Sequence, residues 1–257
     1  MSFVIAVPSY KRVKLIQEKT LRLLEQHDLL DRTTVFVANQ EEFIEYFAAI
    51  GSKVKIIVGV PTIGMQRKYI YSYYPEGTYI LSIDDDIQDV IGLQKKAVDT
   101  FGLKALINFG FLTCEKEKAR IWGLYPIANP FFMQSRPYHS TTLCYICAAF
   151  YGTIKRGSMP PQPDSSSKED IWRSCSYYKE DGAIVRLNHF AIVTKYYLKS
   201  GGLFAEGRTR ETDLVGCNRI KEAFPTYVDI FFRGKEEWPE IRFRRQPKIE
   251  RPPAPTL

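Results

Sequence analysis

An apolar run of strand length ends abruptly at three consecutive aspartates in the segment Ile80-Leu81-Ser82-Ile83-Asp84-Asp85-Asp86. A strand that is apolar on both faces is typical of the interior of a covered sheet. The aspartates cannot lie in that interior, because burying unpaired charge costs several kcal/mol for each ion. We therefore expect them just beyond the carboxyl end of a central strand, where open α/β sheets bind their ligands. The alternative is a polar turn that caps a following helix.

The spacing of the three aspartates predicts the side of the chain to which each carboxylate points. In extended backbone Asp84 and Asp86 point to one side, and Asp85 points to the other. Two carboxylates side by side repel each other unless a cation lies between them, and hard oxygen ligands suit Mg²⁺ or Mn²⁺. The segment is therefore a candidate metal site.

The composition is that of a globular protein, with 257 residues, 45% of them hydrophobic and 14% aromatic. No apolar run approaches the ~20 residues of a membrane span, so we expect no membrane insertion. Residues 1–8 lack the basic lead and the hydrophobic region of a signal peptide. The five cysteines are odd in number and scattered, which favours a reducing, cytoplasmic location with Cys144 and Cys147 as structural thiols.

Strands and helices alternate through the first third of the chain. We expect strands at 3–7, 34–38, 54–58 and 80–83, and amphipathic helices between them at 15–30, 41–50 and 63–74. This alternation predicts a mostly parallel sheet with right-handed crossovers. The sequence has no glycine-rich dinucleotide fingerprint after the first strand and no Walker motif, which argues against a dinucleotide-binding fold and a P-loop NTPase.

The pattern loosens beyond Asp86. We expect a helix around 100–110, strands at 119–126, 143–150 and 183–187, and a loop at 160–167. Lys168-Glu169-Asp170 opens a helix, where acidic residues suit the helix dipole even without another role. A Gly-Gly turn lies within 199–204, and the basic, proline-rich chain after Arg233 is expected to be partly disordered.

The order of these parts resembles the GT-A glycosyltransferases, enzymes that move a sugar from a nucleotide diphosphate donor. Three features carry the resemblance: the opening Val7-Pro8-Ser9-Tyr10, the aspartates 84–86 as the DxD motif, and Glu169-Asp170 as the ED motif. The resemblance implies a GT-A, Rossmann-like α/β fold, with a mostly parallel sheet flanked by helices in a single domain.

The same resemblance implies how the chain is divided. Residues 1–232 would form the glycosyltransferase domain, with 1–87 as the nucleotide-binding half and 88–232 as the acceptor half. Residues 233–257 would form a basic, proline-rich C-terminal extension.

The resemblance also implies roles for single residues in a metal-dependent, inverting transfer. Asp86 would bind the metal, Asp84 would lie near the ribose or the metal's water shell, and His189 would be a third metal ligand or a structural histidine. Asp170 would be the catalytic base, with Glu169 as the alternative, because an attacking hydroxyl must lose its proton. If the enzyme were retaining, this base would not be needed.

Donor binding is implied for a further set of residues. Around the nucleotide it comprises Pro8, Ser9, Tyr10 and Asn39, and around the diphosphate or the sugar Arg67, Asp85, Arg208 and Arg210. For the three arginines, a role as ordinary surface residues is the alternative.

Short stretches resemble, more narrowly, a viral and phage branch of these enzymes related to base J glucosyltransferase. They are Pro-Ser-Tyr-Lys-Arg at 8–12, Ala38-Asn39 and Asp-Asp-Asp-Ile at 84–87. This branch implies a virus- or phage-encoded enzyme acting in the host cell. Its donor would be a UDP-sugar, UDP-glucose in the first instance, and its acceptor a 5-hydroxymethylpyrimidine, above all 5-hydroxymethylcytosine, in DNA.

The net charge of +7 and the isoelectric point near 9.0 are compatible with a polyanionic partner such as DNA. The basic residues gather near the first strand and at the C-terminus: Lys11, Arg12, Lys14, Arg242, Arg244, Arg245, Lys248 and Arg251. An enzyme acting on a base must flip it out of the duplex and stack it on aromatic rings. The candidate rings are Trp122, Tyr125, Phe131, Phe132 and Tyr138, although core packing or stacking on a sugar is the alternative.

Other functions remain open at this point. The same chemistry could act on a glycan, lipid or protein acceptor. A sugar nucleotidyltransferase would share the sheet and the metal, but such enzymes usually carry a glycine-rich basic loop that 9–13 does not match. A non-catalytic nucleic-acid-binding protein is disfavoured by three aspartates at a strand end.

Overall fold

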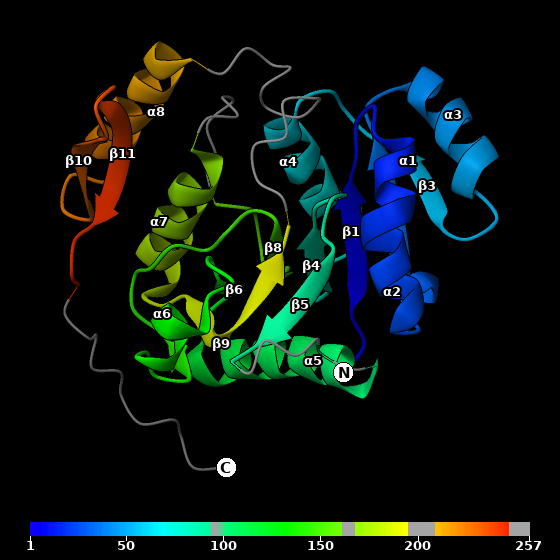
Figure 1. The fold of residues 1–257 in the computed structure, drawn as a ribbon, viewed down its shortest axis with the longest axis horizontal. Coiled ribbons are helices and arrows are strands. Elements are labelled where there is room, and N and C mark those ends of the chain that lie inside the picture. The colour runs from blue at the N-terminus through cyan, green and yellow to red at the C-terminus, as the bar shows by residue number, and fades with distance from the viewer. Residues whose placement is uncertain (94–97, 99, 161–167, 195–208, 247–257) are drawn as a thin grey trace.

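The computed structural model describes residues 1–93, 98, 100–160, 168–194 and 209–246. It contains a large central sheet flanked by helices, and a separate two-stranded hairpin (Figure 1). The strand order in the large sheet is β3-β2-β1-β4-β8-β6-β9-β5, with β7 paired to β9.

The first four strands of the large sheet are parallel neighbours, as the alternating pattern predicts. They are β1 (Val4–Pro8), β2 (Thr33–Val37), β3 (Lys55–Val58) and β4 (Tyr79–Ile83). The connecting helices are α1 (Val13–Ile16), η1 (Gln17–Leu21), α2 (Arg22–Gln26), α3 (Gln40–Ile50) and α4 (Ile63–Tyr73). A short 3₁₀ turn, η2 (Leu30–Arg32), precedes β2. Parallel pairing brings the carboxyl ends of β1, β2 and β4 to one edge of the sheet.

The predicted helix at 15–30 contains an irregular segment. Its middle, η1, is π-helical, and α1 and α2 continue the helix on either side. A π-helical turn inserts an extra residue and changes which side chains face inward. Here Thr20 becomes fully buried beside Leu21.

The approach of α4 to the sheet depends on a glycine. A β-carbon at Gly59 would lie 2.1 Å from Oε1 of Gln66. The Gln66 side chain accepts a hydrogen bond from the Val60 amide at 2.9 Å and donates one to the Val37 carbonyl at 3.1 Å. Glycine after β3 therefore allows α4 to bind directly to the ends of β2 and β3.

The second half of the sheet is mixed. Its elements are β5 (Asp89–Gly92), α5 (Thr100–Glu117), β6 (Ile121–Tyr125), α6 (Pro130–Gln134), β7 (His139–Ser140), β8 (Phe150–Ile154), α7 (Glu169–Asp181) and β9 (Val185–Val193). β8 runs antiparallel to β4 and β6, whereas β9 is parallel to β6 and antiparallel to β5 and β7. Thus β1–β4, β6 and β9 share one direction, which confirms the mostly parallel sheet.

The predicted strand at 143–150 is wrong, because the strand begins only at Phe150. The apolar segment before it is buried without strand pairing. The amide of Ile146 donates to Ser174 Oγ at 3.1 Å, and the carbonyl of Ala148 accepts from Arg67 at 3.0 Å. Side chains thus satisfy backbone groups that a neighbouring strand would otherwise bind, which hydrophobic periodicity does not reveal. Of the other elements up to β9, β5, α6 and β7 were not predicted. α5 runs past its predicted end to Glu117, and β9 runs to Val193, beyond the strand predicted at 183–187.

The C-terminal unit, residues 209–246, consists of α8 (Arg210–Ala223) and a hairpin of β10 (Val228–Arg233) and β11 (Trp238–Phe243). The proposed domain boundary between 232 and 233 falls at the end of β10. The described part of the proposed extension, residues 233–246, contains the strand β11. None of the three elements of the C-terminal unit was predicted from the sequence. Lys248 and Arg251 lie outside the described residues.

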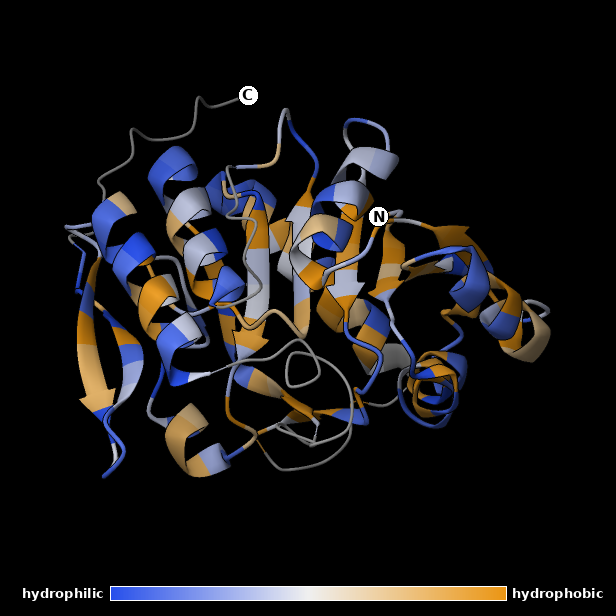
Figure 2. Ribbon diagram, turned by 90° about the horizontal axis from the view of Figure 1, so that it is seen from above, coloured by the Kyte–Doolittle hydropathy of each residue, from blue (hydrophilic) through white to orange (hydrophobic). Residues whose placement is uncertain are grey.

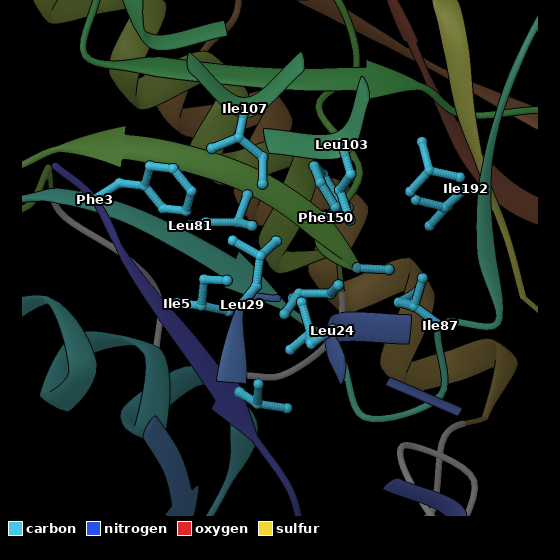
Figure 3. Packing of buried hydrophobic residues seen from close by; sticks show 14 of the residues in the cluster. Phe3, Ile5, Leu24, Leu29, Leu81, Ile87, Leu103, Ile107, Phe150 and Ile192 are labelled. Carbon is cyan, nitrogen blue, oxygen red and sulfur yellow. The ribbon is translucent and has the colours of Figure 1, made fainter. Parts of the chain in front are cut away.

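The main core joins the sheet to α5 and to the helices from α1 to α3. It contains Leu24, Leu103 and Ile107 together with Phe3, Leu81 and Phe150 of the strands and the chain next to them (Figure 3). Figure 2 shows mostly hydrophobic strands and helices with hydrophilic outer surfaces. A second core joins α7 to the C-terminal unit. In the part of the chain that the structure describes, no helix has the length and apolar character needed to cross a membrane. No disulfide joins any of the five cysteines, among them Cys144 and Cys147.

Candidate active site

The turn of the three aspartates lies directly beyond β4, as predicted. Its backbone is held from three directions. The Asp84 amide donates to the Ala149 carbonyl at 2.9 Å, and the Asp84 carbonyl accepts from Thr20 Oγ1 at 2.6 Å. The same hydroxyl accepts from the Ile87 amide at 3.0 Å, while Thr194 Oγ1 donates to the Asp86 carbonyl at 3.2 Å. The turn is therefore fixed by its backbone before any ligand is considered.

The three carboxylates face different partners. Asp84 Oδ1 accepts from Arg67 Nη2 at 2.8 Å. Asp85 Oδ2 accepts from Ser9 Oγ at 2.6 Å, and its Oδ1 accepts from Arg12 Nη1 at 3.1 Å. Asp86 Oδ2 lies 3.8 Å from the same Arg12 nitrogen, and the Asp86 side chain is 21% exposed. Asp85 is thus bound to Ser9 at the end of β1 and to Arg12, and Asp86 faces the same arginine. The predicted division, with Asp84 and Asp86 on one side and Asp85 on the other, is not what these contacts show, because residues 85 and 86 form a turn rather than extended backbone.

The electrostatics of the turn reflect this crowding. Burial raises the pKa of each of the three aspartates, and raises that of Asp85 to about 7. The charge of Arg67 opposes the increase in the pKa of Asp84, and Arg12 opposes it for Asp85 and Asp86. The positive charge of the neighbouring arginines therefore does not fully compensate the negative charge of the three aspartates.

Arg67 lies inside the protein, so it is not the surface arginine of the alternative reading. It is 4% exposed and extends from α4 behind the aspartate turn. Nη1 donates to the Ala148 carbonyl and to Ser82 Oγ, and Nε lies 2.9 Å from Glu169 Oε1. With Asp84 at Nη2, the guanidinium is occupied by protein groups on all sides. In this structure it links the two acidic motifs, and its contact with a donor stays a prediction.

Glu169 and Asp170 begin α7, as predicted, and they differ in environment. Glu169 is buried, with Oε1 at Arg67 and Oε2 3.7 Å from Nη1 of the fully buried Arg173. Asp170 is only partly buried, and its Oδ2 accepts a short hydrogen bond from the Tyr145 hydroxyl. Its Oδ1 accepts from the Ile171 amide at 2.9 Å. Asp170 is therefore the more accessible carboxylate of the pair.

Arg173 adds to the charge network behind Glu169. Its guanidinium carbon lies 4.1 Å from the centroid of the Tyr151 ring. Among the described residues its guanidinium nitrogens have no hydrogen-bond partner, so Arg173 is balanced by the charges of Glu169 and Asp84 at longer range. Cation–π contact with Tyr151 further stabilises it.

The residues predicted around the nucleotide lie along the ends of β1 and β2. Pro8 ends β1, and the Ser9 hydroxyl bridges Asp85 and the Tyr46 hydroxyl, 2.6 and 2.7 Å away. Tyr10 is exposed, while Asn39 caps α3 by accepting from the Glu42 amide at 2.9 Å. These residues gather at the same sheet edge as the aspartates, and their contact with a donor stays a prediction.

Two further predicted residues lie apart from this group. His189 Nε2 is 3.0 Å from the Arg136 carbonyl, and the ring packs edge-on against Tyr138. Arg210 begins α8 and donates to the Glu237 carbonyl at 3.2 Å. The structure does not bring either side chain to the aspartates. Arg208 lies outside the described residues.

Sequence reasoning missed Thr20, Tyr46, Tyr145 and Arg173. Thr20 is placed by the π-helical turn, and Tyr145 lies in the apolar run that was predicted as a strand. Arg173 had a signal, since it follows Glu169 by four residues on a helix and such residues are neighbours. Trp122 and Tyr125, predicted as possible stacking rings, are buried in the core.

The acidic turn has the chemistry to hold a divalent metal. Within the described residues, no group of three or more histidine, cysteine, aspartate or glutamate side chains is arranged as a complete metal site. Mg²⁺ is usually bound through one or two carboxylates together with substrate phosphates and water. Asp86 and Asp84, at the edge where a phosphate can approach, fit that incomplete type of site.

No protein-family model and no curated protein matches the chain. Two solved structures are similar in fold. S. aureus TarS 1–349 in complex with UDP-GlcNAc matches with a TM-score of 0.56 and 16% identity, over 86% of this chain and 66% of that one. GalNAc-T7 with UDP, GalNAc and Mn²⁺ matches with a TM-score of 0.54 and 10% identity, over 86% of this chain and 48% of that one.

This chain spans less than two thirds of the length of either protein. At these identities the similarity shows the fold alone. The chain has the GT-A glycosyltransferase fold, which confirms the fold class predicted from the sequence.

Proposed function

We propose that this protein is a metal-dependent, inverting glycosyltransferase that uses a UDP-sugar donor. The observation that supports this most strongly is the meeting of the two acidic motifs: Asp84 and Glu169 bind the same Arg67 side chain, at 2.8 and 2.9 Å. Residues 84 and 169 are far apart in sequence, so this contact depends on the fold. Similarity to structures solved with UDP-GlcNAc and with UDP, GalNAc and Mn²⁺ supports a uridine nucleotide.

The aspartate turn would receive the diphosphate. Asp86, with Asp84 beside it, would hold the divalent cation, and Asp85 would hold the end of β1 in place through Ser9 and Arg12. The chemistry supplied by a bound cation is neutralisation of the negative charge that develops on the departing diphosphate.

Asp170 would act as the general base. In the proposed step the acceptor oxygen bonds to the anomeric carbon, and the bond from that carbon to the diphosphate oxygen breaks. The bonding electrons leave with the nucleoside diphosphate, and the proton of the acceptor hydroxyl passes to the Asp170 carboxylate. Tyr145 would orient this carboxylate through its hydrogen bond to Oδ2.

For the acceptor we propose a 5-hydroxymethylpyrimidine in DNA, first of all 5-hydroxymethylcytosine, with UDP-glucose as the donor. The net charge of +7 and the exposed aromatic rings support this. Phe131, Phe132 and Tyr138 are 69%, 46% and 43% exposed, so part of each ring is accessible for stacking on a flipped base. Among the basic residues, Lys14 is exposed, while Arg12 and Arg244 are held in ion pairs within the protein.

The test is a screen of nucleotide sugars with Mn²⁺ against DNA that contains 5-hydroxymethylcytosine, 5-hydroxymethyluracil or only ordinary bases. We expect sugar transfer to the modified base alone. Each phosphate contact with the duplex should add about 0.9 to the slope of log affinity against log salt. The matched control is the same screen without divalent metal.

The outcomes separate the parts of the proposal. Donor hydrolysis without a DNA product would be consistent with a glycosyltransferase but not with a DNA acceptor. Glycan, lipid and protein acceptors would then be tested. Condensation of a sugar phosphate with a nucleoside triphosphate would identify a sugar nucleotidyltransferase instead. Failure to turn over any donor with metal present would contradict the central assignment.

A further inference from the structure

The residue before the two acidic residues of α7 has an unusual backbone. Lys168 is the N-cap of α7, with φ of 59° and ψ of 26°, and its side chain makes no capping hydrogen bond. The left-handed region is unfavourable for residues with a β-carbon. Helix N-caps favour serine, threonine, aspartate and asparagine, and a cation is unfavourable at this end of the helix dipole. Local sequence preference therefore does not explain this conformation.

The Lys168 side chain extends into the C-terminal unit. Only 6% of it is exposed, and Nζ donates to Glu240 Oε2 of β11 at 3.0 Å. Nζ also lies 3.7 Å from Oδ2 of Asp213, a fully buried residue of α8. The same Asp213 oxygen accepts from Trp238 Nε1 at 2.9 Å, so its position is fixed within the unit.

Apolar contacts join the same two parts of the molecule along α7. The ring centroids of Trp172 and Phe224 are 5.1 Å apart, and those of Tyr178 and Tyr227 are 5.6 Å apart. Figure 1 shows the C-terminal unit beside α7, on the side of the molecule away from β1. The unit is therefore packed against the helix that begins with Glu169 and Asp170.

We propose that Lys168 is a positioning residue for the catalytic base, and that the C-terminal unit sets the start of α7 through it. This inference rests on the proposed function, in which Asp170 is the base. Arg67 of α4 pairs with Glu169 at 2.9 Å, and Lys168, the residue before it, pairs with Glu240 of the C-terminal unit at 3.0 Å. Release of the lysine would let the first turn rotate and move the Asp170 carboxylate away from Tyr145.

The test compares two aspartate substitutions within the C-terminal unit. Asp213→Asn removes the buried charge that faces Lys168 and keeps the shape of the side chain. Asp229→Asn is the matched control, because Asp229 pairs with Lys221 and Arg244 and has no contact with Lys168. Lys168→Met, Lys168→Arg and Glu240→Gln complete the set, and the thermal transition of each variant reports whether it folds.

For Asp213→Asn and Lys168→Met we expect kcat to fall about tenfold to a hundredfold, because a small misplacement of a catalytic group is costly. The Kd for UDP with Mn²⁺, measured by calorimetry, should stay within about twofold, since the donor residues lie elsewhere. Glu240→Gln should lower kcat less, and Lys168→Arg should retain most of it. Asp229→Asn should change neither quantity.

A second measurement does not depend on turnover. Amide hydrogen exchange at Ile171 and Trp172, in the first turn of α7, should be about tenfold faster in Asp213→Asn than in Asp229→Asn. Unchanged kcat and unchanged exchange in Asp213→Asn would overturn the inference, as would an equal loss of donor affinity and turnover. A wild-type protein that transfers no sugar would contradict the proposed function instead, while the exchange experiment would still decide the role of Lys168.

Discussion

The Asp84–Asp86 turn is fixed through its backbone, whereas the Glu169–Asp170 turn is fixed through side chains from distant elements. The first is bound by the Ala149 carbonyl and by the Thr20 and Thr194 hydroxyls. The second is bound by Arg67, Tyr145 and, through the preceding lysine, by the C-terminal unit.

This difference indicates a different role for each turn. In the first turn Asp84 and Asp85 bind neighbouring side chains, whereas Asp86 has a long ion pair and a partly exposed side chain, so it is the carboxylate most open to a ligand. In the second turn the Glu169 carboxylate is bound by arginines, whereas the Asp170 carboxylate is available for the reaction. Substitutions should therefore act differently at the two turns, and their effects test the comparison.

The largest effect is expected at the first turn. Asp86→Ala should lower sugar transfer by at least about a thousandfold, because charge stabilisation at the diphosphate is lost. The fold should be retained, since the Asp86 side chain is partly exposed and its ion pair with Arg12 is long. Transfer rate and Mn²⁺ affinity are the measurements. Asp89→Ala, just beyond the turn on β5, is the control and should remain active.

Substitutions in the second turn should distinguish the loss of the catalytic base from the loss of a residue that positions it. Asp170→Asn should lower kcat by about a hundredfold to ten-thousandfold, the usual contribution of a general base, with little change in donor affinity. Glu169→Gln should lower kcat less and should preserve the acidic limb of the pH–rate profile. If Glu169→Gln removed that limb and Asp170→Asn did not, the base would be Glu169.

A smaller effect is expected from the hydroxyl that holds the first turn. Thr20→Val removes a donor to the Asp84 carbonyl and an acceptor for the Ile87 amide. Leaving buried polar groups unpaired should lower the free energy of unfolding by about 1–3 kcal/mol for each group, as denaturant titration would show. Thr20→Ser keeps the hydroxyl and should retain most of the stability. Equal stability of the valine variant and the wild type would contradict the described role of the backbone contacts.

The smallest effect is expected at the exposed surface of the C-terminal unit. Hydrogen bonds from Arg244 and then Lys221 lower the pKa of Asp229. A carboxyl whose pKa is lower in the folded state stabilises the protein above its unfolded pKa, and this contribution is lost as the pH falls through the folded pKa. Because Asp229 is exposed to solvent, Asp229→Asn should change the unfolding free energy little at pH 7 and not at all in strong acid. Denaturant titrations at both pH values check this.

The sequence was sufficient to predict the first turn because its determinants are local. An apolar run followed by three aspartates predicts a buried strand with acidic residues at its end. The alternation of strands and helices around it predicts parallel neighbouring strands. The start of α7 was also predictable, since acidic residues suit the first turn of a helix.

The partners of these residues could not be predicted, because they depend on tertiary contacts. Helical periodicity places Arg67 on one face of α4, but it does not show that this face meets Glu169. Tyr145 lies in an apolar run whose backbone is bound by side chains, so the run was predicted to be a strand. His189 was expected just beyond a strand at 183–187, but β9 runs from Val185 to Val193 and contains it, and its ring contacts the Arg136 carbonyl.

The contact between Thr194 and the Asp86 carbonyl joins residues 108 positions apart in the chain. During synthesis on a ribosome, at about 5–20 residues per second, the aspartate turn would emerge roughly 5–20 s before this partner. The four parallel strands can pair in that interval, because their contacts all lie within the first 83 residues. In a nascent chain the four strands of the donor half could therefore be paired before Thr194 is available to bind the Asp86 carbonyl.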